Sequence, residues 1–348
     1  MRPASPYLHE MIYKTPPCQL NLSGSTPPFC GDADFLNDVE MVYDPIKLQN
    51  KKLELAQALA AQQKAQAHEF HYSVGSSLVF TQVLAAVSEP GDTVLIESPT
   101  YDAFVSSAQF LGLKVKFFKR SQDFEKDIRA FKKSRGKAKI LVLSNPNCPT
   151  GQVYSREELL KLSNLVGTLI VDEVFLPLFA RGRMSLLDGD RPKNILTIGS
   201  LSKSVGLSTL RLGWLRADNR VGKKFENIGL NLHIDMPAFS VCAGLKAVKH
   251  WSELTAPNLA RADQNRQLVQ KWAEKNPGRL SHNFAQGYFG TLSVPKPFRS
   301  GDEFAQYFLK KTNVWLRPTR LFHMPKAIRF HLLAPTTDWA KVAPSLLL

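Results

Sequence analysis

Residues 195–203 read Ile195-Leu196-Thr197-Ile198-Gly199-Ser200-Leu201-Ser202-Lys203. An apolar run followed at once by small and hydroxyl-bearing residues predicts a buried strand that ends in a tight turn, with Lys203 in the turn. A lysine amine is a nucleophile at neutral pH only when it is desolvated or lies near another cation, and Arg211 follows eight residues later. By itself the stretch fits either a reactive amine or an ordinary surface loop before a helix.

Two more predicted strands end in polar clusters. Residues 140–143 are apolar and run into Ser144-Asn145-Pro146-Asn147-Cys148-Pro149-Thr150-Gly151, while residues 169–171 run into Asp172-Glu173. Helix-like stretches separate the strands, which is typical of parallel β-α units. Because parallel strands end at the same edge of a sheet, a carboxylate, an amine and an arginine would meet there.

These three motifs, in this order and at this spacing, resemble those of the class I/II aminotransferases, the fold-type I enzymes that use pyridoxal 5′-phosphate (PLP). A weaker similarity extends from about Tyr43 to Arg329. The resemblance implies an α/β fold, with a mostly parallel seven-stranded sheet between helices in a large domain and a smaller α+β domain beside it. It divides the chain into an N-terminal arm and active-site segment (1–42), a PLP-binding large domain (43–237), and a linking helix with the C-terminal small domain (238–348).

The resemblance also implies the roles of individual residues. Lys203 would form a Schiff base with the cofactor aldehyde and then move a proton at the substrate Cα, and Asp172 would bind the protonated pyridine nitrogen. Tyr101 would stack on the pyridine ring, unless it is an ordinary half-buried loop tyrosine. Arginine, hydroxyl and backbone N–H groups would hold the cofactor phosphate, contributed by Arg211, Ser200, Ser202, Gly75, Ser76 and Ser77.

Two positions depart from the family's pattern. Cys148 stands where an asparagine commonly precedes Pro-Thr-Gly, and Phe175 stands where a tyrosine commonly follows the Asp-Glu motif. A thiol donates a hydrogen bond weakly and a phenyl ring not at all, so the cofactor's O3′ would lose both of its usual donors. Asn147, one residue before the cysteine, would be a substitute donor. All three side chains are predicted to contact the cofactor.

Further resemblances concern the substrate and the second subunit. Arg329 would hold the substrate α-carboxylate with its guanidinium fork, although Arg317 and Arg320 compete for that role. The stretch around Ser23 and Gly24 resembles the mobile segment that closes over the substrate. Tyr43 resembles the tyrosine that reaches the phosphate bound in the other subunit, which would make the protein a homodimer with shared active sites. The alternative for Tyr43 is an ordinary N-terminal loop tyrosine.

Three functions follow from these motifs. The first is an aminotransferase that moves an amino group between an amino acid, or an amino-acid phosphate, and a 2-oxo acid. The second is a decarboxylase or lyase on the same scaffold, since Phe175 also resembles the branch that contains histidinol-phosphate aminotransferases and threonine-phosphate decarboxylases. The third is a non-catalytic binding protein. The joint presence of Lys203, Asp172 and Arg211 argues against this third function.

Composition limits the other partners. The formal net charge of +15 is concentrated in residues 114–139, but no nucleic-acid motif accompanies these cations, which favours a solvated basic face. No run of eighteen apolar residues occurs, and the start Met1-Arg2-Pro3-Ala4-Ser5-Pro6 lacks the apolar core of a secretory signal. The four cysteines form no Cys-x-x-Cys pair. We therefore expect a cytoplasmic protein that binds neither nucleic acid, nor membrane, nor metal.

Overall fold

The computed structural model describes residues 5–275, 277, 287–342 and 345, and its largest element is a seven-stranded sheet. The order of the strands in this sheet is β2-β8-β7-β6-β5-β3-β4. All neighbours from β7 to β4 are parallel, whereas β8 runs antiparallel to both β7 and β2. The strands are β2 (Phe70–Val74), β3 (Thr93–Ser98), β4 (Lys114–Lys119), β5 (Ile140–Ser144), β6 (Thr168–Asp172), β7 (Ile195–Ser200) and β8 (Leu212–Arg216).

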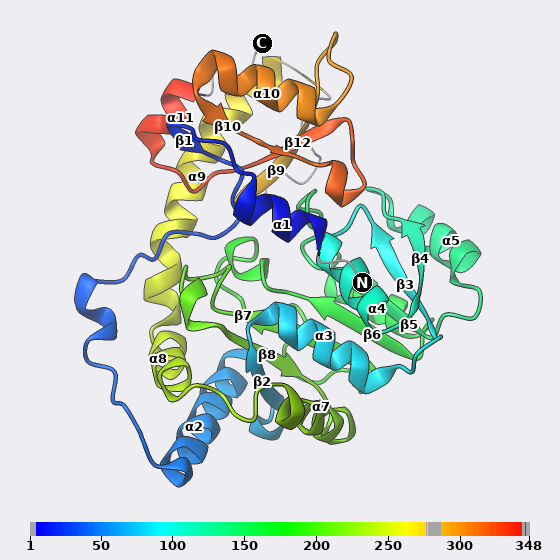
Figure 1. The fold of residues 1–348 in the computed structure, drawn as a ribbon, viewed down its shortest axis with the longest axis vertical. Coiled ribbons are helices and arrows are strands. Elements are labelled where there is room, and N and C mark those ends of the chain that lie inside the picture. Colours follow the sequence, from blue (N-terminus) through cyan, green and yellow to red (C-terminus); the bar gives the residue numbers. More distant parts are fainter. Residues whose placement is uncertain (1–4, 276, 278–286, 343–344, 346–348) are drawn as a thin grey trace.

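Helices cover both faces of this sheet (Figure 1). Alternate strand residues point to opposite faces, so Val142 and Ile170 pack in one apolar cluster and Leu141 and Leu169 in another. The first cluster contains side chains of α3 (Ser76–Val87), α4 (Asp102–Phe110) and α7 (Asn219–Leu232). The second contains side chains of α5 (Phe124–Arg135) and α6 (Arg156–Ser163), and a third joins α2 (Pro45–Gln63) and α8 (Ala238–Lys249) to the end of the sheet. Burial on both faces explains why the central strands are almost wholly apolar.

A smaller layer lies beyond the carboxyl ends of the parallel strands (Figure 1). Its three-stranded sheet has the order β11-β12-β9, and all of its strands are antiparallel. The long helix α9 connects the large sheet to this layer. The elements of this part are α9 (Trp251–Lys275), β9 (Phe289–Ser293), α10 (Gly301–Thr312), β10 (Val314–Trp315), β11 (Arg317–Pro318), β12 (Ala327–His331) and α11 (Thr336–Val342).

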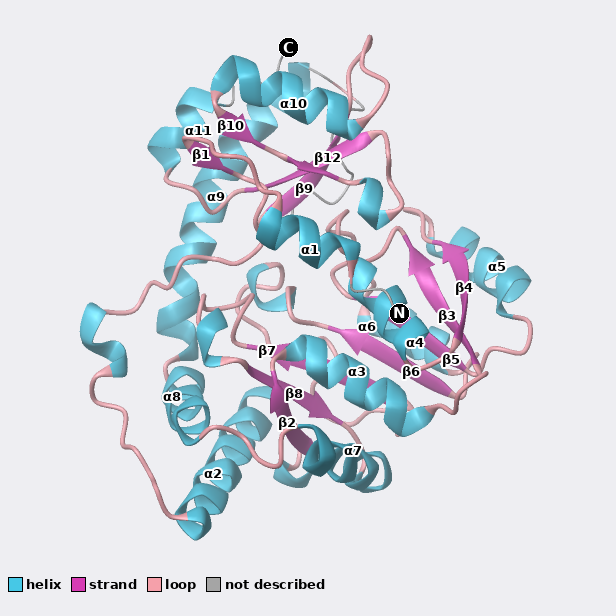
Figure 2. Cartoon of the chain, viewed as in Figure 1, coloured by secondary structure: helices cyan, strands magenta, loops and turns pink. Residues whose placement is uncertain are grey.

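The N-terminal residues belong to the smaller layer. Helix α1 (Pro6–Tyr13) lies between the two layers, and β1 (Leu20–Asn21) pairs in parallel with β10. From β1 the chain returns as a long loop with one short turn, η1 (Ala33–Leu36), before α2 begins (Figure 2). The other short 3₁₀ turns are η2 (Ala67–Glu69), η3 (Leu176–Leu178), η4 (Ser208–Leu210) and η6 (Arg320–Phe322).

Neither a candidate membrane span nor a candidate metal-binding cluster occurs among the described residues. No helix in this part of the chain combines the length and the apolar character that a membrane span requires. Within the same residues, no three His, Cys, Asp or Glu side chains gather in a way that could bind a metal ion.

Candidate active site

The register of the large sheet brings the sequence motifs to one edge. Asp172 ends β6 and pairs with Ser144 at the end of β5, and Ser200 ends the neighbouring strand β7. Strand β8 runs in the opposite direction, so its beginning, where Arg211 precedes Leu212, lies at the same edge. Val74 is the register partner of Leu212, which places the turn at Gly75 there as well. Sheet topology alone therefore gathers residues that are far apart in the sequence.

An anion cradle lies beside the start of α3. Gly75 has a positive φ of 80°, and a Cβ at this position would lie 2.1 Å from Nη2 of Arg211, so only glycine fits under the guanidinium group. The helix begins directly after it, and the backbone N–H groups of Ser76 and Ser77 belong to the first turn, which has no intrahelical acceptor. Ser200 Oγ is buried and has no hydrogen-bond partner among the described residues. A phosphate group fits this combination of guanidinium, hydroxyl and N–H donors.

Asp172 is a buried carboxylate, and none of the ion pairs among the described residues involves it. Its Oδ1 accepts a hydrogen bond from Val174 N at 3.0 Å. Burial raises the pKa of Asp172 to about 7, and the nearby Glu97 carboxylate adds to this, while Lys203 acts in the opposite direction. A carboxyl group in this position ionises fully only when a cation is placed against it. A protonated ring nitrogen would satisfy that requirement.

Lys203 carries an amine that is partly deprotonated near neutral pH. Burial lowers the pKa of Lys203 to about 8, and the positive charges of Arg329 and Arg211 contribute to the decrease. The Nζ atom donates to Ser25 Oγ at 3.2 Å and to Thr26 Oγ1 at 2.8 Å. Sequence reasoning identified Arg211 as the neighbouring cation, but in the structure Arg329 lowers the pKa of Lys203 more strongly.

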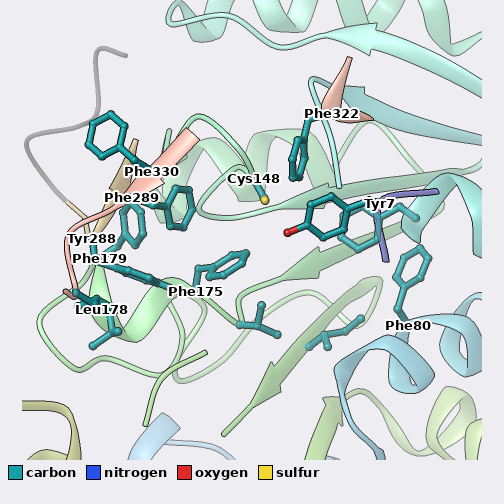
Figure 3. Close-up of a cluster of buried hydrophobic side chains, with 14 of the residues drawn as sticks. Tyr7, Phe80, Cys148, Phe175, Leu178, Phe179, Tyr288, Phe289, Phe322 and Phe330 are labelled. Atoms are coloured by element: carbon teal, nitrogen blue, oxygen red, sulfur yellow. The ribbon is translucent and has the colours of Figure 1, made fainter. Parts of the chain in front are cut away.

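Arg329 is buried, and its hydrogen-bond partners in the described part of the chain are neutral. Its Nη1 donates to Cys148 Sγ at 3.2 Å, and its Nη2 donates to Tyr7 Oη at 3.2 Å and to Ser23 O at 3.0 Å. Figure 3 shows Cys148 between the ring of Phe322 and the aromatic group that contains Phe175 and Phe289, with the hydroxyl of Tyr7 directed toward this space. A guanidinium group with weak neutral acceptors is ready to bind a carboxylate.

The structure separates the three competing arginines. Arg317 is also buried, and its Nη2 donates to Ser23 Oγ at 3.1 Å while its guanidinium carbon lies 5.6 Å from the centre of the Tyr7 ring. Burial lowers the pKa of Arg317, and the charge of Arg329 adds to this effect. Arg320 is partly exposed and pairs with Glu10 and Asp302. Two of the three arginines, Arg317 and Arg329, thus converge on one interior space.

The remaining predicted residues are placed as follows. Tyr101 bonds with the Ser77 hydroxyl and meets the Tyr7 ring edge-on, with 5.6 Å between the ring centres. The rings of Phe175 and Phe289 lie 5.0 Å apart in an edge-on contact. Ser202 is buried in the turn before Lys203, and Gly24 lies between Ser23 and Ser25 on the segment that covers the site.

Two predicted residues make contacts that differ from those expected of cofactor ligands. Asn147 uses its amide within the loop, because Nδ2 donates to Pro99 O at 2.9 Å and Oδ1 accepts from the Thr150 hydroxyl at 2.7 Å. This arrangement does not support the prediction that Asn147 replaces the missing donor. Tyr43 is 90% exposed on the loop before α2, away from this chain's own site.

The sequence did not indicate that Tyr7, Ser25 and Thr26 belong to the site. Tyr7 lies on α1, where Asp102 Oδ2 accepts from Ser5 Oγ at 2.6 Å and from Tyr7 N at 3.1 Å, so the helix is fixed beside the Tyr101 loop. A signal for these contacts is absent from the local sequence, because each joins segments about 95 residues apart or more.

The fold and the site together define a class of α/β proteins in which a lysine, a carboxylate and an anion cradle meet at the carboxyl edge of the large sheet. Solved structures share this fold: a PLP-dependent aminotransferase from Streptococcus suis superposes with a TM-score of 0.79 at 20% identity, over 95% of this chain and 92% of that one. Aspartate aminotransferase from Thermotoga maritima gives a TM-score of 0.78 at 20% identity, over 94% and 92%.

The sequence comparison identifies the family. The sequence profile described as Aminotransferase class I and II matches residues 42–341, and the chain belongs to this family. It is 28% identical, over 70% of its own length and 64% of the relative, to a (5-formylfuran-3-yl)methyl phosphate transaminase from Methanocaldococcus jannaschii. It is 27% identical to a histidinol-phosphate aminotransferase from Methanocella arvoryzae, over 58% of this chain and 56% of that one. The matches therefore span less than two thirds of these relatives.

Proposed function

We propose that this chain is a PLP-dependent aminotransferase that moves an amino group between an amino acid, or an amino-acid phosphate, and a 2-oxo acid. The observation that carries the proposal is the meeting of Lys203, Asp172 and the Arg211 cradle at one edge of the sheet. An amine, a buried carboxylate and an anion cradle are the groups that the aldehyde, the ring nitrogen and the phosphate of PLP would require. Family membership supports the same assignment.

PLP, when bound, supplies an aldehyde that exchanges amines and a ring that withdraws electrons from the substrate Cα. The protein would hold it through Arg211, Ser200 and the N–H groups of Ser76 and Ser77, with the negative charge of Asp172 directed at the ring nitrogen. Lys203 has a pKa near 8, so its amine can accept a proton at the substrate Cα and return it. Tyr7 and the segment around Ser25 cover the site and exclude water.

The test of this function is a spectrum of the purified protein with added PLP, wild type beside Lys203→Ala. We expect a visible band that depends on Lys203, that disappears with an amino donor as the cofactor takes its amine form, and that a 2-oxo acid restores. If amino acids instead yield carbon dioxide or ammonia without the amine form, the chain is a decarboxylase or lyase on this scaffold. If no band depends on Lys203, the cofactor assignment is wrong.

We also propose that the substrate carries a second anionic group. Arg317 and Arg329 place two buried guanidinium groups in one space, and each of the described ion pairs involves other residues. One carboxylate compensates only one of these charges, whereas a phosphate monoester or a second carboxylate compensates both. Two relatives of this chain are named for phosphorylated substrates.

Substrate pairs test the second anionic group. With amino donors that differ only by a phosphate or a second carboxylate, the wild type should prefer the doubly anionic member in kcat/KM by roughly 100-fold, the equivalent of about 3 kcal/mol for one charge-assisted contact. Arg317→Met should remove most of this preference and leave the singly anionic donor little changed. An equal loss for both donors would place Arg317 in a general structural role instead.

We propose, finally, that the active form is a homodimer with shared sites. Tyr43 projects from the loop before α2, and a groove of about 880 Å³ between α2, β2 and α7 has exposed apolar residues at its rim. Apolar side chains that are more than half exposed on this face are Ile46, Leu53, Leu230, Leu232 and Ile234. A second copy would bury them and would bring its Tyr43 to the anion cradle.

Mixing two inactive variants tests this arrangement. Lys203→Ala and Tyr43→Ala chains, unfolded and refolded together, form mixed dimers in which one site has both residues intact. We expect activity to return in the mixture, and sedimentation to give a dimer for each protein. A monomer, or a mixture as inactive as its components, would contradict the shared site.

A further inference from the structure

Residues 22–29, here called the strap, are fixed to the smaller layer. Leu22 bonds through its backbone to Trp315 and His331 on either side. Tyr288 Oη donates to Ser25 O at 2.7 Å, and Asn258 Nδ2 donates to Pro28 O at 2.9 Å. All of these anchors, and the two arginines that hold Ser23, lie on α9 or on the strands of the smaller layer and the loops beside them. The hydrogen bonds of residues 22–25 therefore join the strap to the smaller layer, while Phe29 at its end packs against the cluster of α2 and α8.

The strap reaches the large sheet at the turn that follows β7. Thr26 and Ser25 accept hydrogen bonds there from Lys203 Nζ, at 2.8 and 3.2 Å. The backbone passes so close to this turn that a Cβ on Gly206 would lie 2.6 Å from Phe29 N. The proposed reactive amine is thus held by hydroxyl groups that belong to the opposite layer.

We propose that Ser25 and Thr26 are positioning residues whose hydroxyls form a resting socket for the free amine of Lys203 and thereby couple the state of this amine to closure of the strap. A free amine or ammonium has N–H donors to spare for both hydroxyl oxygens. A covalent bond at Nζ uses these donors and draws the nitrogen away, so the socket empties and residues 22–26 lose their hydrogen-bonded connection to the large sheet, while Phe29 still packs against it. The inference rests on the proposed function only in taking Lys203 as the amine that reacts.

The two hydroxyls act on Lys203 in a different way from its charged neighbours. The charged and titratable groups that act on Lys203 are Arg329, Cys148, Arg211 and Asp172, and the hydroxyls supply its only hydrogen-bond acceptors among the described residues. Thr26 is exposed at its outer side, so replacing it does not open a cavity in the core. The two hydroxyls can therefore be removed with little disturbance of the packing.

The first experiment measures the reactivity of Lys203 in the cofactor-free protein. Trace labelling with acetic anhydride between pH 6 and 10, read by mass spectrometry, gives the midpoint at which this amine deprotonates. Because the hydroxyl oxygens stabilise the ammonium form, the double variant Ser25→Ala with Thr26→Val should label with a midpoint lowered by about one pH unit. Ser88→Ala, which removes a hydroxyl that bonds Leu84 O at the end of α3, is the matched control and should match the wild type.

The second experiment measures hydrogen exchange in the strap. Amides of residues 22–26 should exchange faster in the double variant and in Lys203→Met, and at the wild-type rate in Ser88→Ala. An unchanged labelling midpoint in the double variant, or strap exchange that does not respond to Lys203→Met, would overturn the proposal. Neither readout needs PLP or turnover, so a failure here is distinct from the absence of a band that depends on Lys203, which would contradict the proposed function.

Discussion

Four of the arginines that the structure describes are buried, and they fall into two groups. Arg120 lies below the active-site loops, with Nη1 at 2.7 Å from Glu97 Oε2 and its guanidinium group 3.7 Å from the centre of the Tyr154 ring. Arg216 lies in β8, with Nε at 2.9 Å from Glu69 Oε2. Each of these two is paired with a carboxylate, although Arg216 shares Glu69 with Arg191.

The other two arginines, in the site, have none among the described residues. Arg317 bonds to the Ser23 hydroxyl, and Arg329 bonds to a thiol, a phenol and a backbone carbonyl. Asp172 is an acidic residue in the same situation. Burial raises its pKa, and its described hydrogen bond comes from a neutral N–H group. Buried charge is costly unless it is paired. The contrast shows that Arg120 and Arg216 are compensated within the fold, whereas Arg317, Arg329 and Asp172 have no described counter-ion, which supports the proposal that a ligand supplies it.

The largest effect should come from breaking a structural pair. Arg120→Met leaves the Glu97 carboxylate buried without its cation, and we expect the free energy of unfolding to fall by about 3–5 kcal/mol in chemical denaturation. The double variant that also carries Glu97→Gln removes both charges and should recover part of the loss. A decrease in the free energy of unfolding below about 1 kcal/mol for Arg120→Met would mean that Arg120 contributes no more to stability than the unpaired arginines do.

The sequence predicted the local part of the site and missed the part that tertiary structure assembles. Lys203, Asp172 and Gly75 follow strands in recognisable turns, so their place at the sheet edge follows from strand order. The sequence named Arg329 for the substrate carboxylate but could not exclude Arg317 and Arg320. Only burial and neighbouring residues distinguish the three arginines.

The contacts of the N-terminal segment are also invisible in sequence. Thr26 and Lys203 are 177 residues apart, and nothing in the composition of the strap identifies its hydroxyls as acceptors for this amine. Predicting such a contact requires knowing that β1 joins the smaller layer through β10, which places the following residues over the site. Pairing of two-residue strands leaves no periodic signal.

A smaller effect should appear in the pH dependence of stability of the cofactor-free protein. The pKa of Asp172 is raised to about 7 by folding from an ordinary value of 3.8, so the folded state holds this proton more tightly than the unfolded state. The contribution to stability is complete below the unfolded pKa and is lost as the pH rises toward 7. Asp172→Asn stays neutral and should therefore gain roughly 3 kcal/mol relative to wild type between pH 5 and pH 8.

Urea denaturation at pH 5, 6, 7 and 8 gives this difference directly. The exposed Asp38→Asn variant is the control and should follow the wild type at every pH. A difference between Asp172→Asn and wild type that does not change with pH would mean that the carboxylate is already compensated in the absence of cofactor, as Glu97 is by Arg120.

The smallest effect separates the two groups of arginines most clearly. Arg317→Met removes a buried cation that has no carboxylate partner, so the free energy of unfolding in phosphate-free buffer should stay within about 1 kcal/mol of wild type or rise, unlike that of Arg120→Met. In an Arg211→Met background, which removes the guanidinium group of the anion cradle, inorganic phosphate at ten times its dissociation constant should then stabilise the protein by about 1.4 kcal/mol, because it binds only the folded site. The increment should shrink when Arg317→Met is added and persist with Ser88→Ala, and chloride at equal ionic strength should not reproduce it. A loss of several kcal/mol in Arg317→Met without any ligand would place this arginine with the structural pairs and remove the distinction.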